Sequence, residues 1–142
     1  MKKVTINTEL GSKFQVQATA GQHQLIIDQP KAAGGDGMGP SPLEYFLISI
    51  AGCYSAIAKI VAKQQRVELT RFDVEVSGEL DPAVLLGKSD GRAGFEKIEV
   101  AIKMESNLSE NDAQAFVDTV SQRCPVSDNV KYASNLTHSV NQ

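Results

Sequence analysis

Hydrophobic and polar positions alternate with a period of two in three short runs, at residues 4–8, 14–18 and 23–27. Such alternation is typical of strands with one buried face. Turn signals at Gly11-Ser12 and Ala20-Gly21 separate the runs. The pattern therefore predicts a three-stranded antiparallel meander at the start of the chain.

A glycine-rich loop over residues 29–40 follows the predicted strands. It resembles a phosphate-binding loop only in its glycine content, because no Gly-Lys-Ser/Thr follows. Ser41, Pro42 and Glu44 then mark the start of a helix, with Ser41 as the N-cap, Pro42 at the first position and Glu44 closing a capping box. We expect this helix to reach about Gln65 and to carry Cys53.

The predicted helix is apolar on more than one side. Its uncharged stretch over residues 45–58 has 14 residues, fewer than the roughly 18 that a membrane-spanning helix needs. A helix without a clean polar face has to be covered all round. We therefore expect a homodimer that buries two such helices together, and no membrane partner.

The second half of the chain predicts three further strands and two shorter helices. Alternation at residues 72–76 and 98–104 indicates the strands, and residues 81–94 between them are typical of a long mobile connection. We expect the apolar residues 84–86 of this connection to fold over the core or to contact a partner. Ser109 caps a helix that ends near Arg123, Pro125 opens a helix near residues 126–132, and residues 136–140 are the last strand. The sum is an α+β fold in a single domain, residues 1–142.

Composition excludes several classes of function. Lys and Arg number 14 against 17 Asp and Glu, a formal net charge of −3, so no bulk positive field exists to bind nucleic acid. The N-terminus lacks the apolar run of a secretory signal, which indicates a cytoplasmic protein. Two cysteines and two histidines, without close pair spacings, predict neither a disulfide scaffold nor a metal centre.

The candidate chemistry lies with the cysteines. Cys124 directly precedes Pro125, which places it near a helix N-terminus, where backbone N–H groups favour a thiolate. Alternatively, both cysteines are small buried hydrophobes. Tyr54 and Ser55 flank Cys53 and either donate hydrogen bonds to its thiol or pack within the helix. His23, on a predicted strand, is expected in the core or at an interface. His138, on the last predicted strand, is expected to have no chemical role.

Two motifs carry a resemblance to a known family. The segment Gly39-Pro-Ser-Pro-Leu-Glu-Tyr-Phe-Leu-Ile-Ser-Ile-Ala-Gly-Cys53 and the later Cys124-Pro-Val-Ser127 together resemble the osmotically inducible protein C and organic hydroperoxide resistance (OsmC/Ohr) family. The resemblance covers the whole chain in order. It implies an α+β fold in which two chains intertwine, with the long helices central and the sheets outside.

The resemblance also implies a chemistry. Cys53 is then the peroxidatic residue, whose thiolate attacks the O–O bond of a hydroperoxide and becomes a sulfenic acid. Cys124 is the resolving residue, which condenses with it to a disulfide. A dithiol, in much of the family a lipoylated protein, reduces the disulfide. No cofactor is implied, because sulfur supplies both electrons.

The chain departs from the peroxidase pattern at two positions. In those members an arginine from the N-terminal half, held by a glutamate, activates the thiol, whereas the first arginine here is Arg66. Lys31 supplies charge without a bidentate fork, and Arg123 is another candidate cation. The glutamate position holds Leu43, with Glu44 one place later.

Helical geometry separates Glu44 from the thiol. Nine residues at about 100° each place Glu44 half a turn round from Cys53, about 13 Å along the axis. Glu44 is therefore expected to be a capping carboxylate, with a role in a site formed with the other subunit as the alternative.

The sequence thus predicts a cytoplasmic homodimer that reduces organic hydroperoxides through Cys53 and Cys124. One alternative is a dimer without peroxidase activity that binds a small hydrophobic ligand near Cys53 or senses redox state. A third is a thiol enzyme that acts on a different electrophile.

Overall fold

The computed structural model describes residues 1–142, which form two compact units, residues 1–46 and 47–142. Helix α1, Pro42–Gln65, crosses the boundary between them without a break. The mixture of strands and helices confirms the predicted α+β class. The assignment of residues 1–142 to one domain stays a prediction.

The first unit begins with the predicted meander, which is confirmed. Strands β1 (Ile6–Leu10), β2 (Val16–Ala20) and β3 (His23–Ile27) pair antiparallel in the order β1-β2-β3. Thr8 and Leu25 both lie opposite Ala18, which is buried. His23 begins β3 and is exposed, so the expectation that it lies in the core is wrong for the single chain, and its role at an interface stays a prediction.

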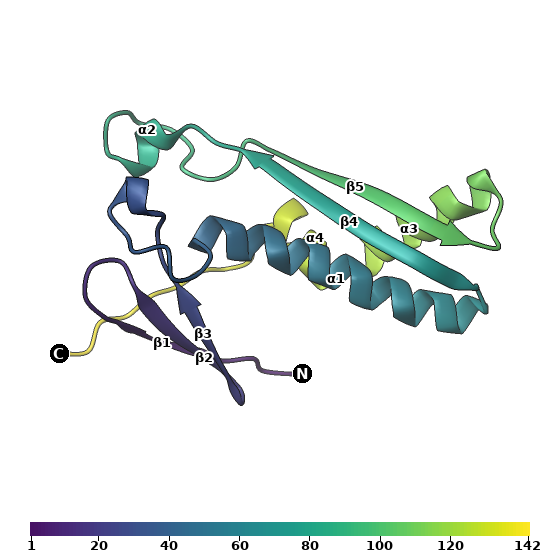
Figure 1. Ribbon diagram of the computed structural model, residues 1–142, viewed down its shortest axis with the longest axis horizontal. Helices are drawn as coiled ribbons and strands as arrows, with labels where there is room; N and C mark the ends of the chain where they lie inside the picture. The colour runs from purple at the N-terminus through teal and green to yellow at the C-terminus, as the bar shows by residue number, and fades with distance from the viewer. The chain divides into compact units, whose positions relative to one another are not determined.

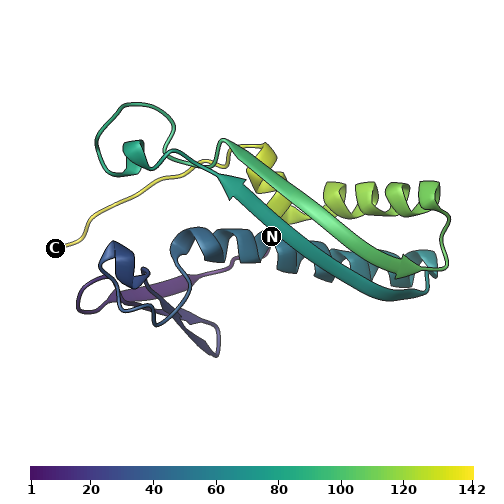
Figure 2. The same cartoon turned by 45° about the horizontal axis from the view of Figure 1, so that its top comes forward.

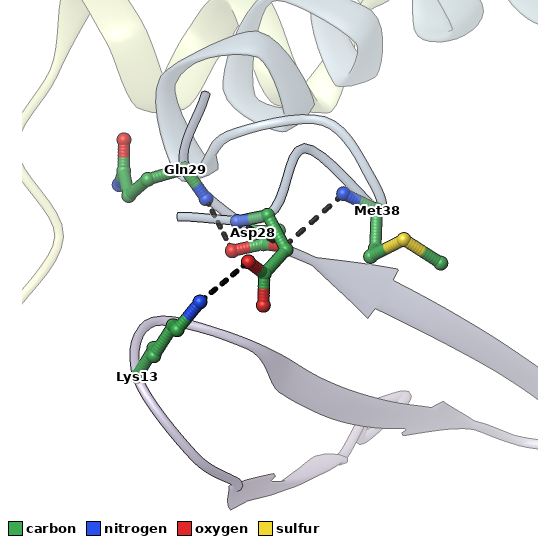
Figure 3. A network of polar contacts seen from close by, with 5 residues as sticks. Lys13, Asp28, Gln29 and Met38 are labelled. Carbon is green, nitrogen blue, oxygen red and sulfur yellow. Dashed lines mark hydrogen bonds and ion pairs between the residues drawn. The ribbon is translucent and has the colours of Figure 1, made fainter. Parts of the chain in front are cut away.

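The glycine-rich loop folds around a buried carboxylate, that of Asp28, which is 1% exposed. Its oxygens accept hydrogen bonds from the backbone N–H groups of Gln29 (2.8 Å), Asp36 (3.3 Å) and Met38 (3.1 Å). Figure 3 shows the amides of Gln29 and Met38 directed at Asp28, with Lys13 below them. Lys13 Nζ forms an ion pair with Asp36 Oδ1 at 2.6 Å. The amide of Met38 contributes most to lowering the pKa of Asp28, because hydrogen bonds to the charged form stabilise it.

A glycine at position 35 lets the loop close this tightly. A Cβ atom on Gly35 would lie 2.0 Å from the carbonyl oxygen of Gln29 and 2.7 Å from the Asp28 carboxylate. The amides that a phosphate-binding loop would offer to a ligand are therefore taken by the chain's own carboxylate, which explains the superficial likeness in glycine content.

Helix α1 begins with the predicted capping box. The amide of Glu44 donates to Ser41 Oγ (3.3 Å), and the amide of Ser41 donates to Glu44 Oε2 (2.7 Å). The hydroxyl of Tyr45 donates to the carbonyl of Ile26 (2.9 Å), which joins the first turn of α1 to β3.

The second unit pairs a long β-ribbon with helices. Strands β4 (Leu69–Glu79) and β5 (Lys97–Ser106) are antiparallel, with Val74 opposite Ile102. Figures 1 and 2 both show the ribbon running alongside α1 and α3 (Glu110–Arg123). Both strands and the cap of α3 are as predicted, since Ser109 Oγ accepts from the amide of Asp112 (3.2 Å).

One stripe of α1 forms the core of the second unit. Ile50, Tyr54, Ala58 and Val61 are buried at spacings of three and four residues. Against them pack Phe116 and Val120 of α3 and the inner face of the β-ribbon.

The rest of α1 keeps large apolar side chains at the surface of the single chain. Those that are at least 39% exposed are Leu43, Phe46, Ile48 and Ile60. A single chain therefore does not cover all sides of α1. The homodimer stays a prediction. By length and composition alone α1 would also suffice to cross a membrane, a property that core helices of soluble proteins share.

Two predicted segments differ from the structure. Residues 81–94 contain a short helix, α2 (Pro82–Leu85), capped by Asp81, whose carboxylate accepts from the amide of Ala83 (2.9 Å). Residues 136–140 form no strand, so that prediction is wrong. A strand needs a neighbour for its backbone hydrogen bonds, and Leu136 and Val140 are instead 92% and 80% exposed.

Replacing Asp28 tests the loop. Its folded-state pKa is lowered, so its stabilising contribution is complete above the ordinary value of 3.8 and is lost as the pH falls through the folded-state pKa. We expect Asp28→Asn to lower the thermal midpoint at neutral pH and to flatten its decline between about pH 5 and about pH 2. Circular dichroism melts measure this. The control Asp90→Asn, at an exposed loop position, should keep the wild-type decline, and equal slopes in all three proteins would contradict the assignment.

Candidate active site

The two thiols meet in the second unit although 71 residues separate them in sequence. Cys53 Sγ and Cys124 Sγ lie 2.7 Å apart, in hydrogen-bond contact, and both cysteines are free. A disulfide requires sulfurs at about 2.05 Å, so a small movement suffices to join them. The convergence expected from the sequence is confirmed.

The buried stripe of α1 places Cys53. It follows Ile50 by three residues, on the border of the core-facing stripe, and is half-buried. Cys124 is 0% exposed and belongs to the core itself. Of the two sulfurs, only that of Cys53 is therefore open to a molecule from solution.

Cys124 joins two helices and caps the second of them. It ends α3 and begins α4, Pro125–Lys131, where its sulfur accepts a hydrogen bond from the amide of Ser127 (3.3 Å). Pro125 occupies the first helical position, where the missing N–H costs nothing. The Cys-Pro-Val-Ser sequence thus acts as a helix start with sulfur in the place of the usual oxygen cap. The predicted third helix is confirmed.

Burial makes Cys53 harder to ionise. Burial is the largest cause that raises the pKa of this thiol above its ordinary 9.0. The adjacent Cys124 raises the pKa further, chiefly through its hydrogen bond with the Cys53 thiol and to a smaller extent through charge repulsion. The backbone N–H of Val126, in the first turn of α4, acts in the opposite direction. None of these groups is a cation.

The candidate cations are engaged elsewhere or lie in the other unit. Arg123 Nη1 donates to Gln64 Oε1 (2.7 Å) at the far end of α1. Lys31 belongs to the short 3-10 helix η1, Lys31–Ala33, of the first unit. Activation of Cys53 by Lys31 therefore stays a prediction.

The hydroxyl groups beside Cys53 do not reach its sulfur, so that expectation is wrong. Tyr54 is buried and donates to Ser121 Oγ on α3 (3.0 Å), because the next position on a helix is rotated by about 100° toward the core. Ser55 donates to the carbonyl of Ala51 within α1 (3.0 Å). The packing alternative is confirmed for both residues.

Glu44 and His138 take no part in the thiol contact. The hydrogen bonds of Glu44 are those of the capping box, which also lower the pKa of its carboxyl group. A role for Glu44 in a shared site stays a prediction. His138 is exposed in the C-terminal segment, outside any strand. No group of three or more His, Cys, Asp or Glu side chains is arranged to hold a metal ion.

Sequence reasoning missed three residues on the two helices that meet at Cys124. Val126 supplies the amide beside Cys53, and Ser121 and Lys131 bond to each other (3.1 Å). The Cys-Pro motif at the start of a helix indicates backbone amides without a partner, so the sequence could have predicted the role of the Val126 amide. Nothing in the sequence predicts the pairing of Ser121 with Tyr54, because that contact depends on how α3 is rotated against α1.

Comparison with known proteins identifies relatives over most of the chain. The family model described as OsmC-like protein matches residues 34–139. Proteins named hydroperoxide reductase from Mycoplasma genitalium and Mycoplasma pneumoniae are each 27% identical to this chain. The first match covers 95% of this chain and 92% of the relative, and the second covers 99% and 95%.

Solved structures share the fold. The crystal structure of an OsmC-like protein from Mycoplasma pneumoniae has a TM-score of 0.81 at 26% identity, over 93% of this chain and 89% of that one. An organic hydroperoxide resistance protein OsmC from Legionella pneumophila has a TM-score of 0.67 at 23% identity, over 92% and 90%. Together with the match to the family model, these likenesses confirm the resemblance carried by the two cysteine motifs: the chain belongs to the OsmC-like protein family.

Proposed function

We propose that this protein is a thiol-dependent peroxidase that reduces organic hydroperoxides through Cys53 and Cys124. The observation that carries the proposal is the 2.7 Å contact between the two free sulfurs. The names of the relatives, hydroperoxide reductase among them, support the substrate class. Cys53 packs against the hydrophobic core, as does Ile57 one helical turn later, and apolar surroundings favour an organic hydroperoxide over a small polar peroxide.

The different burial of the two sulfurs supports a different role for each in the proposed cycle. The half-buried Cys53 thiolate attacks the terminal, hydrogen-bearing oxygen of the hydroperoxide and the O–O bond breaks. The alkoxide takes up the proton that the Cys53 thiol has given up and leaves as an alcohol. Cys53 is then a sulfenic acid, oxidised by two electrons. Cys124, fully buried beside it, is shielded from the hydroperoxide and is suited to the second step.

The second step closes the disulfide. Cys124 sulfur attacks Cys53 sulfur, the S–O bond breaks, and the hydroxyl leaves as water with the proton of the Cys124 thiol. A dithiol, such as the lipoyl group of a lipoylated protein, then returns both thiols and becomes a disulfide itself. The cycle needs no metal or organic cofactor.

The assembled protein completes the site in this proposal. Within the second unit, the amide of Val126 alone acts to lower the pKa of Cys53, against burial and the second thiol. A homodimer that covers the apolar surface of α1 would bring further groups, Lys31 and Glu44 among them, within reach. We place the protein in the cytoplasm, where the thiols stay reduced between cycles.

A raised pKa also favours a second candidate function. A thiol that ionises poorly is a slow nucleophile at neutral pH, so the same pair of cysteines suits a redox sensor or a binding protein for a small hydrophobic ligand. Catalytic consumption of a hydroperoxide distinguishes the peroxidase from the sensor and the binding protein.

A peroxidase assay tests the main proposal. Purified protein mixed with cumene hydroperoxide and dihydrolipoamide should consume the hydroperoxide catalytically, because the dithiol regenerates both thiols. Cys53→Ser should abolish turnover, a loss of at least about a thousandfold, because the nucleophile is gone.

Cys124→Ser is the matched control for the assay. With hydroperoxide alone, it should consume one equivalent to form a sulfenic acid on Cys53 and a second, more slowly, to form a sulfinic acid, because no resolving thiol converts the sulfenic acid to a disulfide. Equal and negligible consumption by the wild-type protein and Cys53→Ser would contradict the peroxidase proposal and favour the second candidate.

Oxidation should link Cys53 to Cys124. After one equivalent of cumene hydroperoxide, non-reducing peptide mapping is expected to find the two cysteine-containing peptides joined, because the sulfurs already touch. Two free thiols after peroxide treatment would count against a catalytic pair.

Alkylation reports the ionisation of Cys53. The rate at which iodoacetamide modifies Cys53, followed by mass spectrometry between about pH 7 and about pH 11, should rise with a midpoint above 9.0, since burial raises the pKa. Cys124→Ser should move the midpoint down because the hydrogen bond and the charge repulsion by which Cys124 raises the pKa of Cys53 are both removed. A wild-type midpoint below 9.0 would show instead that a cation of the assembled protein outweighs burial.

A further inference from the structure

A single hydroxyl group, that of Ser121, joins the three helices that surround the thiols. The hydroxyl of Tyr54 on α1 donates to Ser121 Oγ at 3.0 Å, and Lys131 Nζ on α4 donates to the same oxygen at 3.1 Å. Ser121 itself lies on α3. Both lone pairs of the hydroxyl oxygen are therefore used, one by a buried neutral donor and one by a charged donor.

Each partner of this network lies close in sequence to a sulfur. Tyr54 directly follows Cys53 on α1, and Ser121 precedes Cys124 by three residues, about one turn of α3. Lys131 ends the helix that Cys124 begins. A shift of Ser121 relative to Tyr54 therefore moves the backbone of Cys124 relative to that of Cys53.

Helix α4 depends on contacts at both of its ends. It has seven residues, too few for a helix that is stable by itself. Its first turn is held by the sulfur cap of Cys124 at 3.3 Å and its last residue by the bond from Lys131 to Ser121. Loss of the Ser121 hydroxyl removes the second of these and also leaves the Tyr54 hydroxyl, on a residue that is 7% exposed, without its acceptor.

We propose that Ser121, with Tyr54 and Lys131, is a positioning residue that keeps the Cys124 thiol within reach of oxidised Cys53 and so sets the rate of disulfide closure. The inference rests on the proposed function, and it concerns the second step alone. Attack of Cys53 on the hydroperoxide forms the S–O bond without using Cys124. Closure forms the S–S bond and expels water only when the two sulfurs meet, so displacement of Cys124 prolongs the life of the sulfenic acid.

Trapping of the sulfenic acid tests the inference. Reduced protein receives one equivalent of cumene hydroperoxide in the presence of dimedone, which reacts with sulfenic acids, and mass spectrometry measures the ratio of dimedone adduct on Cys53 to Cys53–Cys124 disulfide. We expect Ser121→Ala to raise this ratio by at least about tenfold, because misplacement of a reacting group costs one to two orders of magnitude in rate. The rate at which hydroperoxide is consumed in the first turnover should change by less than about twofold, because that step does not use Cys124.

Four further variants separate positioning from folding. Ser121→Thr keeps the hydroxyl and should restore the wild-type ratio. Thr119→Ala removes another hydroxyl of α3, one that bonds only to the carbonyl of Ala115 in its own helix (3.0 Å), and should not change the ratio. Tyr54→Phe and Lys131→Met each remove one of the two bonds and should give intermediate ratios. Lys131 is exposed, so Lys131→Met remains informative if Ser121→Ala does not fold.

The outcomes are distinguishable. No oxidation of wild-type Cys53 by the hydroperoxide would overturn the proposed function and this inference with it. Normal closure in the wild-type protein, combined with unchanged ratios in Ser121→Ala and Lys131→Met, would overturn the inference alone. A raised ratio in Ser121→Thr or in Thr119→Ala equal to that of Ser121→Ala would also overturn it, because the effect would then not follow the hydroxyl of Ser121.

Discussion

The contact between Cys53 and Cys124 depends on the packing of α1 against α3. Val61 and Val120 are both 0% exposed, and they hold the two helices in one register while 71 residues of chain separate the sulfurs. Closing so long a segment is entropically costly, and it is the burial of apolar surface that stabilises it. The contact between the two thiols therefore depends on the packing of the core. A change that lets α1 slide along α3 should alter the distance between the two sulfurs.

The same burial acts in opposite directions on the two steps of the proposed cycle. It brings the thiols together, which favours closure of the disulfide, and it raises the pKa of Cys53, which disfavours the first attack. The amide of Val126 offsets part of the second effect. A protomer built in this way is better prepared for the second step than for the first, and this is the physical reason to look for activating groups in the proposed homodimer.

What the sequence predicted well was local. The capping box at Ser41, the meander turns and the helix start at Pro125 each follow from residues within a few positions of one another. The thiol contact itself was expected from the family resemblance. The failures are all matters of tertiary context: residues 136–140 alternate like a strand but have no pairing neighbour in the chain, and the direction of the Tyr54 hydroxyl depends on the rotation of α1 against α3.

Backbone amides around an acidic group occur twice in this chain, with different consequences. In the glycine-rich loop, three amides surround Asp28, whose lowered pKa keeps it charged at neutral pH, so the arrangement is fixed and structural. In the first turn of α4, the amide of Val126 faces the sulfur of Cys53 and the amide of Ser127 donates to that of Cys124. The hydrogen bonds from these amides are strongest when a sulfur is negatively charged, and they weaken again when the disulfide forms. The short helix thus stabilises the reactive form of the pair more than its resting or oxidised forms, which is what a site for thiolate chemistry requires.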